Sequence, residues 1–427
     1  MRSTEHNRPA EALRASLRAG EPTIWSKGEP PLPRSSPSLA LTRLADARAR
    51  FDRFAPALGR LFGEGSWDGR IRSPLRAYPI GADDRTGLWV KCDHELPLTG
   101  TIKARGGVHE VLQFVEETAL RLGLVTLGED YACLADARAR TALAERRVGV
   151  GSTGNLGLSV GMAARAFGLQ AEVHMSADAK AWKKVRLRAL GVEVVEHEGD
   201  YADAVAAARA RFQALGDHAH FVDDEHSEAL FVGYAVAAYE LAEQLEAAGI
   251  GIDDEHPLFV YLPCGVGGAP GGISYGLKAI YGDDVRCVFA EPVASASMLA
   301  ALAFPGPQPT SVYALGLTNR TLADGLATPA ASQLVLDLVG DEIDAVVALP
   351  DDRFLHWVGE AWAAARVRVE PSAAAGFAAW DHLAHVSRGA DRPAYLYRGW
   401  ARATHIVWTT GGAMLPDAEF RALLPSV

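Results

Sequence analysis

One lysine stands where the chain could bind an aldehyde. Lys103 follows a short apolar segment, residues 87–92, and precedes apolar residues that recur at helical spacing from Val108 onward. It therefore falls in the loop or first turn where a helix begins. The helix dipole and Arg105, two residues away, both favour a neutral amine, the form that attacks an aldehyde to make a Schiff base. Most lysines are solvated and inert, so this interpretation depends on the surrounding sequence.

A glycine-rich stretch at residues 265–272 is a candidate phosphate site. It follows an uninterrupted apolar run, 258–262, that suits a buried central strand, and a helix is predicted over 273–281. Glycines let successive N–H groups turn toward an anion, and the helix start adds its dipole. No lysine of the G-x-x-x-x-G-K-[ST] type follows, and Pro270 replaces the third glycine of a dinucleotide fingerprint. A phosphate site is favoured over a nicotinamide site or a plain tight turn.

Two further strand ends carry hydroxyl groups. The stretch 152–155 precedes a predicted helix and could either cap that helix or bind a carboxylate. Thr410 follows the apolar strand 406–408 and could be a satisfied β-branched residue. Ligands of open α/β sheets bind beyond the carboxyl ends of strands, so these loops can meet Lys103 and the glycine-rich stretch in one cleft. A phosphorylated aldehyde bound to a lysine explains all four features, and that cofactor is pyridoxal 5′-phosphate.

Composition narrows the class of protein. The chain has 427 residues, and its 42 basic and 53 acidic residues give a net charge of −11, which argues against a nucleic-acid or anionic-membrane partner. Its four cysteines are far apart and form no CxxC pair, which suits a reducing cytosol. The N-terminus has no apolar signal-peptide core, and no stretch is suited to span a membrane. We expect a cytoplasmic protein, either a monomer or a small homo-oligomer.

The predicted elements indicate the α/β class. Strands at 148–150, 171–175 and 192–195 alternate with helices at 156–167 and 201–215. Such alternation implies a parallel sheet with right-handed crossovers.

The motifs resemble those of the bacterial D-serine dehydratases (D-serine ammonia-lyases), pyridoxal-phosphate enzymes with the tryptophan-synthase-β-like fold, fold type II. Departures are Ala269, where the family often has glycine, His226, where asparagine is expected, and the poorly matched region 293–320. The matching segments occur in the family's order and are residues 90–93, 99–107, 150–159, 221–225, 265–272, 323–327, 370–373 and 404–412.

The resemblance implies two open, twisted, mostly parallel sheets flanked by helices, with the active site between the two domains. We expect a large cofactor-binding domain at 1–119 and 226–427, which includes an irregular N-terminal arm at 1–36 with at most one short helix. A small substrate-side α/β domain is expected at 120–225.

The resemblance also assigns roles to particular residues. Lys103 forms the Schiff base and moves the Cα proton, Asn155 bonds the ring hydroxyl, and Thr410 faces the pyridine nitrogen. The substrate carboxylate is expected at Ser152, Thr153 and Gly154. The residues expected to cradle the 5′-phosphate are Gly265, Val266, Gly267, Gly268, Gly271 and Gly272.

The roles expected for two further carboxylates are less specific. Asp223 is a candidate acid/base partner on the face opposite Lys103, although a surface carboxylate fits its position equally well. Glu291 ends a predicted strand and resembles the carboxylate that some relatives use for a metal ion, a monovalent K⁺ or Na⁺ or a divalent cation.

The expected reaction is α,β-elimination of D-serine to pyruvate and ammonia, and also of D-threonine to 2-oxobutanoate. A hydroxyl at Thr410 does not hold the ring nitrogen protonated, so the ring is a weaker electron sink and expulsion of a β-leaving group is favoured over racemisation. Only the family resemblance points to the D-enantiomer. An L-serine/threonine dehydratase or a serine racemase on the same fold is one alternative. A catalytically silent binding protein with the same fold is another.

Overall fold

The structure is a computed structural model that describes residues 7–28, 37–63, 67–79, 87–152, 154–198, 201–387 and 395–424. Thr153, one of the residues expected to bind the substrate carboxylate, lies outside these ranges. Within them, every helix is too short or too polar to cross a lipid bilayer.

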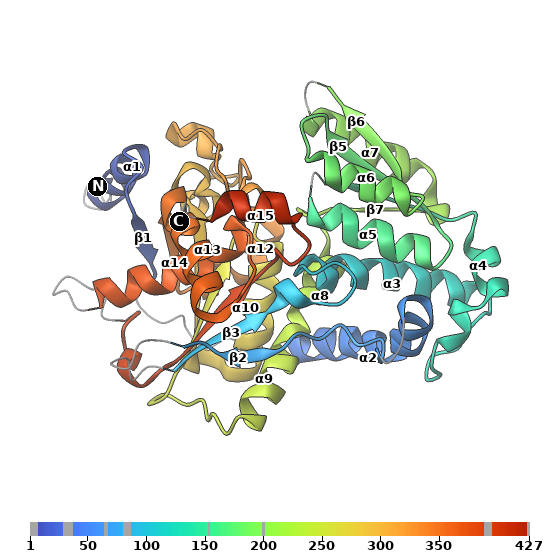
Figure 1. Cartoon of the computed structure of the whole chain (residues 1–427), viewed down its shortest axis with the longest axis horizontal. Coiled ribbons are helices and arrows are strands. Elements are labelled where there is room, and N and C mark those ends of the chain that lie inside the picture. The colour runs from blue at the N-terminus through green and yellow to red at the C-terminus, as the bar shows by residue number, and fades with distance from the viewer. Residues whose placement is uncertain are drawn as a thin grey trace.

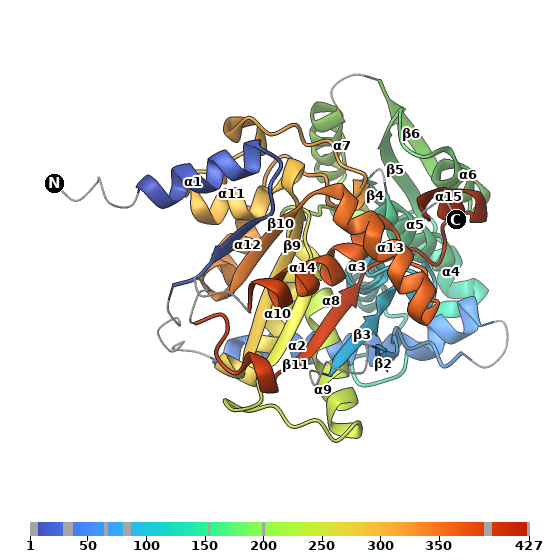
Figure 2. The same cartoon turned by 60° about the vertical axis from the view of Figure 1, so that its left-hand side comes forward.

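The larger of two sheets has seven strands in the order β1-β10-β9-β8-β11-β3-β2. Its five inner strands are parallel, and only the edge strands β1 and β2 run antiparallel to their neighbours (Figure 2). The bounds of the seven strands are β1 Thr23–Ser26, β2 Leu75–Ala77, β3 Leu88–Cys92, β8 Leu258–Pro263, β9 Val285–Pro292, β10 Ala345–Leu349 and β11 Thr404–Thr409.

The smaller sheet is wholly parallel and has the order β6-β5-β4-β7. It lies with its helices at one end of the molecule, at the upper right of Figure 1. The prediction of two mostly parallel α/β sheets is confirmed, and the domain boundaries near 119 and 225 stay a prediction. The strands are β4 Arg147–Gly151, β5 Gln170–Ser176, β6 Glu193–His197 and β7 Ala219–Val222, and the helices between them are α5 Asn155–Ala166, α6 Ala181–Ala189 and α7 Tyr201–Ala214.

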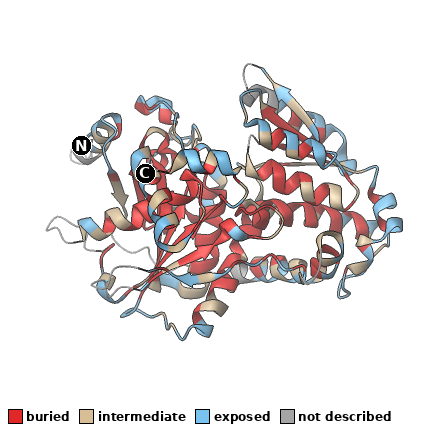
Figure 3. Ribbon diagram, in the orientation of Figure 1, coloured by how far each residue is buried: buried red, intermediate tan, exposed pale blue. Residues whose placement is uncertain are grey.

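Helices cover the larger sheet, and α14, Pro371–Val386, runs against it with eleven buried residues (Figure 3). The alanines of α14 make this close approach possible because small side chains bring the helix axis near the strands. The remaining helices are α1 Asn7–Arg18, α2 Pro37–Phe62, α3 Lys103–Arg121, α4 Ala137–Leu143, α8 Glu228–Ala235, α9 Ala237–Ala247, α10 Gly268–Tyr281, α11 Ser297–Ala303, α12 Gln333–Val339, α13 Asp351–Ala365, α14 Pro371–Val386 and α15 Asp417–Leu423.

The structure differs from the sequence prediction in the N-terminal arm and in the glycine-rich stretch. Besides one short helix, α1, which the prediction allowed, the arm contains the strand β1, which extends the larger sheet by pairing with β10. The helix predicted over 273–281 begins five residues earlier, at Gly268, so only the first part of the glycine-rich stretch is a loop.

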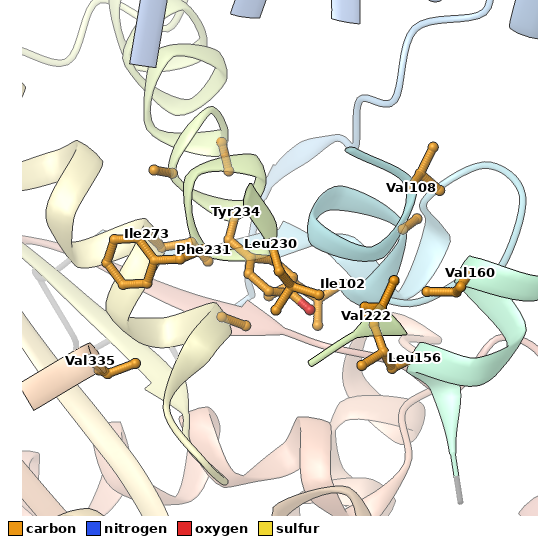
Figure 4. Packing of buried hydrophobic residues seen from close by; sticks show 14 of the residues in the cluster. Ile102, Val108, Leu156, Val160, Val222, Leu230, Phe231, Tyr234, Ile273 and Val335 are labelled. Carbon is orange, nitrogen blue, oxygen red and sulfur yellow. The ribbon is translucent and has the colours of Figure 1, made fainter. Parts of the chain in front are cut away.

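Helix α3 is held between α8 and α5 by close packing. A Cβ atom on Gly106 would lie 2.5 Å from the Tyr234 ring of α8, and one on Gly107 would lie 2.9 Å from Leu156 of α5. Figure 4 shows Tyr234 and Leu156 among the buried residues of these three helices. The two glycines therefore let both neighbours approach α3 immediately after Lys103, and this contact fixes the first turn of the helix.

Candidate active site

Lys103 is the first residue of α3, as its sequence context predicts. The preceding residues join the loop after β11, because the Ile102 N–H donates to the Thr410 carbonyl at 2.8 Å and Thr101 pairs with Gly411 in an antiparallel bridge. Two of the four expected loops are thus connected through their main chains.

The Lys103 ammonium group pairs with Asp224, with Nζ 3.0 and 3.2 Å from the two carboxylate oxygens. Burial works to lower the pKa of Lys103, but Asp224 and Tyr234 outweigh it, so the pKa lies above its ordinary value. The expected preference for a neutral amine is therefore wrong. Arg105 turns away from Lys103 to pair with other acids, and Asp224, which is remote in sequence, supplies a counter-charge.

The start of α10 faces the same space as Lys103. Gly267, with φ 108°, occupies the N-cap, and no side chain caps this helix. A Cβ atom on Gly268 would have no neighbour closer than 3.6 Å, and at that distance it would meet the Asp224 backbone oxygen, Asp224 Oδ1 and Leu230 Cδ2. One carboxylate therefore contacts Lys103 and borders an uncapped helix start, where backbone N–H groups can receive a phosphate.

The other residues of the glycine-rich stretch have packing roles in this structure. A Cβ atom on Gly271 would lie 2.7 Å from Val335 of α12, and one on Gly272 would overlap the Phe231 carbonyl oxygen of α8. Gly265 lies against the Gly325 carbonyl, and the Val266 carbonyl accepts the Ser332 N–H at 2.8 Å. Their part in a phosphate cradle stays a prediction.

Asn155 begins α5, and its side-chain amide donates to Glu370 Oε1 at 3.0 Å. The same Glu370 oxygen would lie 2.6 Å from a Cβ atom on Gly411, so this carboxylate connects α5 to the loop after β11. Burial raises the pKa of Glu370. Glu370 lies in the matching segment 370–373, but no role was predicted for it. Its place immediately before Pro371, the first residue of α14, was the available signal.

Thr410 follows β11 and is 9% exposed. Its hydroxyl forms no hydrogen bond within the part of the chain that the structure describes, whereas the Thr409 hydroxyl donates to the Lys91 carbonyl at 2.9 Å. The Thr410 hydroxyl is thus available to a ligand. Ser152 belongs to the stretch expected to bind the substrate carboxylate, and its Oγ accepts the Gly154 N–H at 3.2 Å.

The two candidate carboxylates already have partners. Asp223 Oδ2 lies 2.6 Å from Arg209 Nε and 3.3 Å from His226 Nδ1, and its acid/base role stays a prediction. Glu291 is fully buried and accepts the N–H groups of Met298 and Leu299 at 2.7 and 3.0 Å, which anchors the start of α11. Burial raises the pKa of Glu291 to about 8.

These residues fit pyridoxal phosphate. The uncapped start of α10 suits its phosphate, the Lys103 amine lies beside that helix start, and Asn155 and Thr410 offer an amide and an unbonded hydroxyl from neighbouring loops. Together with two mostly parallel sheets, this arrangement defines a pyridoxal-phosphate enzyme of fold type II.

Comparison with known proteins supports the assignment to the pyridoxal-phosphate enzymes. The family described as "Pyridoxal-phosphate dependent enzyme" matches residues 67–392, and the chain belongs to this family. A protein of Burkholderia thailandensis named "Probable D-serine dehydratase" is 51% identical over 421 residues, which cover 96% of this chain and 93% of the relative. A protein of Cupriavidus pinatubonensis with the same name is 49% identical over 416 residues, with coverage of 95% and 93%.

Solved structures share the fold. Diaminopropionate ammonia lyase from Escherichia coli in complex with D-serine has a TM-score of 0.72 at 20% identity and covers 95% of this chain and 97% of its own. Maize serine racemase has a TM-score of 0.63 at 20% identity, with coverage of 90% and 98%. At these identities the likeness supports the fold alone.

Proposed function

We propose that this chain is a pyridoxal-phosphate dependent ammonia-lyase that converts D-serine to pyruvate and ammonia, and D-threonine to 2-oxobutanoate. The observation that carries the proposal is the Lys103 amine at the start of α3, held by Asp224 beside the uncapped start of α10. The relatives with about half their residues identical, over nearly the full length of both chains, support D-serine as the substrate.

In the proposed reaction, bound pyridoxal phosphate supplies an electron sink that acidifies the substrate Cα–H bond. Lys103 Nζ accepts the Cα proton, and Asp224 stabilises the positive charge that develops on this amine. The β-hydroxyl leaves as water after an acid protonates it, and Asp223 is the predicted donor. The released 2-aminoacrylate then takes up water and yields pyruvate and ammonia.

Asn155 and Thr410 orient the cofactor in this proposal. Glu370 accepts one N–H of the Asn155 amide and leaves the second for the ring hydroxyl. The Thr410 hydroxyl faces the ring nitrogen without holding it protonated, which favours loss of the β-hydroxyl over racemisation.

A K⁺ or Na⁺ ion at Glu291 is a further part of the proposal. Its support is a fully buried carboxylate whose raised pKa a cation would lower again. A rise in Tm in K⁺ or Na⁺ relative to tetramethylammonium supports the ion, and equal Tm values in all three contradict it.

We also expect a cytoplasmic monomer or small homo-oligomer. All four cysteines are free thiols, as a reducing compartment favours.

The test measures pyruvate release from D-serine and L-serine together with the absorbance of the purified protein. We expect a lysine-bound chromophore and turnover of D-serine. Lys103→Ala removes the lysine-bound chromophore and lowers kcat by at least about a thousandfold, because it deletes both the covalent anchor and the base. Lys180→Ala, at the exposed N-cap of α6, serves as the control and keeps both properties. Equal turnover of the two enantiomers would overturn the substrate assignment.

A further inference from the structure

A second lysine faces the cleft from the smaller sheet. Lys183, on α6, is 4% exposed, and its Nζ lies 3.6 Å from the place of a Cβ atom on Gly154. Gly154 is the N-cap of α5, next to Asn155. The stem of Lys183 is buried, and its charged end therefore lies next to the start of α5.

The ammonium group of Lys183 lacks a close acceptor. Its one ion pair within the described ranges is with Asp324 at 3.8 Å, beyond hydrogen-bonding distance, and no described residue accepts a hydrogen bond from Nζ. Asp324 itself is 46% exposed and shares its carboxylate with Lys180 at 3.9 Å. Glu370 is a further carboxylate whose charge interacts with Lys183. Because no described side chain accepts a hydrogen bond from the ammonium group, an anion between Lys183 and α5 would be stabilised there.

The start of α5 is a second group with positive charge at this place. This helix has 12 residues, and no side chain caps it, since Gly154 occupies the N-cap. Its first N–H groups and the positive end of its dipole therefore point to the place that Lys183 also reaches. The phosphate has its own uncapped helix start at α10. An anion bound between Lys183 and α5 would therefore be a different group from the phosphate.

We propose that Lys183 binds the α-carboxylate of the amino-acid substrate together with the start of α5, and that the substrate replaces Asp324 as its partner. This inference rests on the proposed function. Asp324 belongs to a loop that packs against α14, which covers the larger sheet, whereas Lys183 belongs to the smaller sheet's layer. A bound carboxylate would therefore replace an ion pair that joins the layers of the two sheets. Amines without a carboxylate could not replace this ion pair, so the enzyme would bind them weakly.

The first experiment separates binding from chemistry. Lys183→Met should raise the KM for D-serine about 10- to 100-fold, the loss expected for one charge-assisted hydrogen bond, and change kcat less than about threefold. Lys183→Arg keeps the charge and should recover most of the affinity. Lys180→Met, at the N-cap of the same helix and 44% exposed, should leave KM within about twofold. An unchanged KM in Lys183→Met, or an equal rise in Lys180→Met, would overturn the proposal.

The second experiment needs no turnover. D-alanine has the carboxylate but no leaving group, and 2-aminoethanol has the hydroxyl but no carboxylate; the Kd of each follows from the change in cofactor absorbance. Lys183→Met should weaken D-alanine by about the factor seen in KM and leave 2-aminoethanol within about twofold. Equal weakening of both ligands would contradict carboxylate binding. Because D-alanine binding is independent of pyruvate release, failure of the proposed function and of this inference are distinguishable.

If Lys183→Met does not fold, the affinity of Asp324→Asn for D-alanine tests the proposal instead. Removing the competing carboxylate should tighten D-alanine about 2- to 10-fold, because the free Lys183 no longer has to exchange partners. An unchanged or weaker Kd in Asp324→Asn would overturn the proposal.

Discussion

Charged residues lie on both sides of the first turn of α3, and the two groups are organised in opposite ways. Away from the cleft, Arg105 donates to Asp93 at 2.7 and 2.8 Å and to Glu240 at 2.8 Å, and Lys91 pairs with Glu240. Trp408 Nε1 adds a further bond to Asp93 at 2.8 Å. We call Lys91, Asp93, Arg105 and Glu240 the buried charge cluster, because none is more than 7% exposed.

The cleft group is looser. The side chains of Lys103 and Asp224 are 21% and 27% exposed, and Lys183 meets Asp324 only at 3.8 Å. The comparison indicates that the two groups of charged residues have different roles, one structural and one in ligand binding. The buried charge cluster has no unsatisfied member and can hold the start of α3 in one place, whereas the cleft group keeps charges whose partners a ligand can replace.

The largest expected effect comes from breaking the buried charge cluster. Arg105→Met leaves Asp93 and Glu240 buried without their main partner and should lower the free energy of unfolding by about 3–5 kcal/mol. Urea unfolding measures it. The matched control is Arg48→Met, whose ion pair with Glu243 is 43% and 41% exposed and should change stability by at most about 1 kcal/mol. Equal losses in both variants would contradict the anchoring role.

A smaller effect is expected from the partner of Lys103. Asp224→Asn removes the carboxylate that raises the pKa of this lysine, so the pKa should fall and kcat should drop about 10- to 100-fold. Competitive labelling of the cofactor-free protein across pH follows the pKa. Asp223→Asn is the neighbouring comparison, and it should leave the pKa of Lys103 unchanged. A larger loss of kcat at Asp223 would instead favour its predicted role as the acid, and an unchanged pKa in Asp224→Asn would disprove the pairing.

The smallest effect concerns pH and the buried side of α3. Burial and the charge of Arg50 lower the pKa of His109 to about 3. Its Nδ1–H donates to the Ala229 carbonyl at 2.8 Å, and its Nε2 accepts from Arg50 at 3.0 Å, so the neutral ring fits the site. The unfolded chain takes up this proton near pH 6.5, and the stability that the neutral ring contributes above that pH is lost on acidification.

We therefore expect His109 alone to account for about 2 kcal/mol of stability lost between pH 7 and pH 5. Urea unfolding at both pH values measures this loss, and His109→Gln should reduce the pH dependence by that amount. An identical pH dependence in the variant and the parent would show that His109 titrates normally in the folded protein.

Local patterns predicted the elements that carry the site. The strand before Lys103, the helix that starts at it, and the strands before the other three loops all lie where periodicity placed them. Sequence reasoning failed where packing overrides local preference. Glycines and Pro270 suggested a loop up to residue 273, but α10 starts at Gly268 because close contact with α8 and α12 favours residues without side chains there.

The short strand β10 was not predicted because periodicity alone does not separate a run of five apolar residues from a segment of a buried helix. Helical spacing places Glu110 and Glu116 off the apolar face of α3, yet both are buried, since His220 pairs with Glu110 and Arg50 and Arg53 pair with Glu116. Sequence spacing shows which face a residue occupies, and not which partner will cover that face.

The sequence by itself determined the chemical groups available to this protein, which are an amine at one helix start, glycines at another and hydroxyls after two strands. All of them lie in short segments whose secondary structure follows from the pattern of neighbouring residues. Only the tertiary structure decided which carboxylate meets Lys103, that Arg105 turns away from it, and that Lys183 reaches the start of α5. The reason is physical. Periodicity depends on residues a few positions apart, whereas charge pairing depends on distances between side chains that folding brings together across more than a hundred positions.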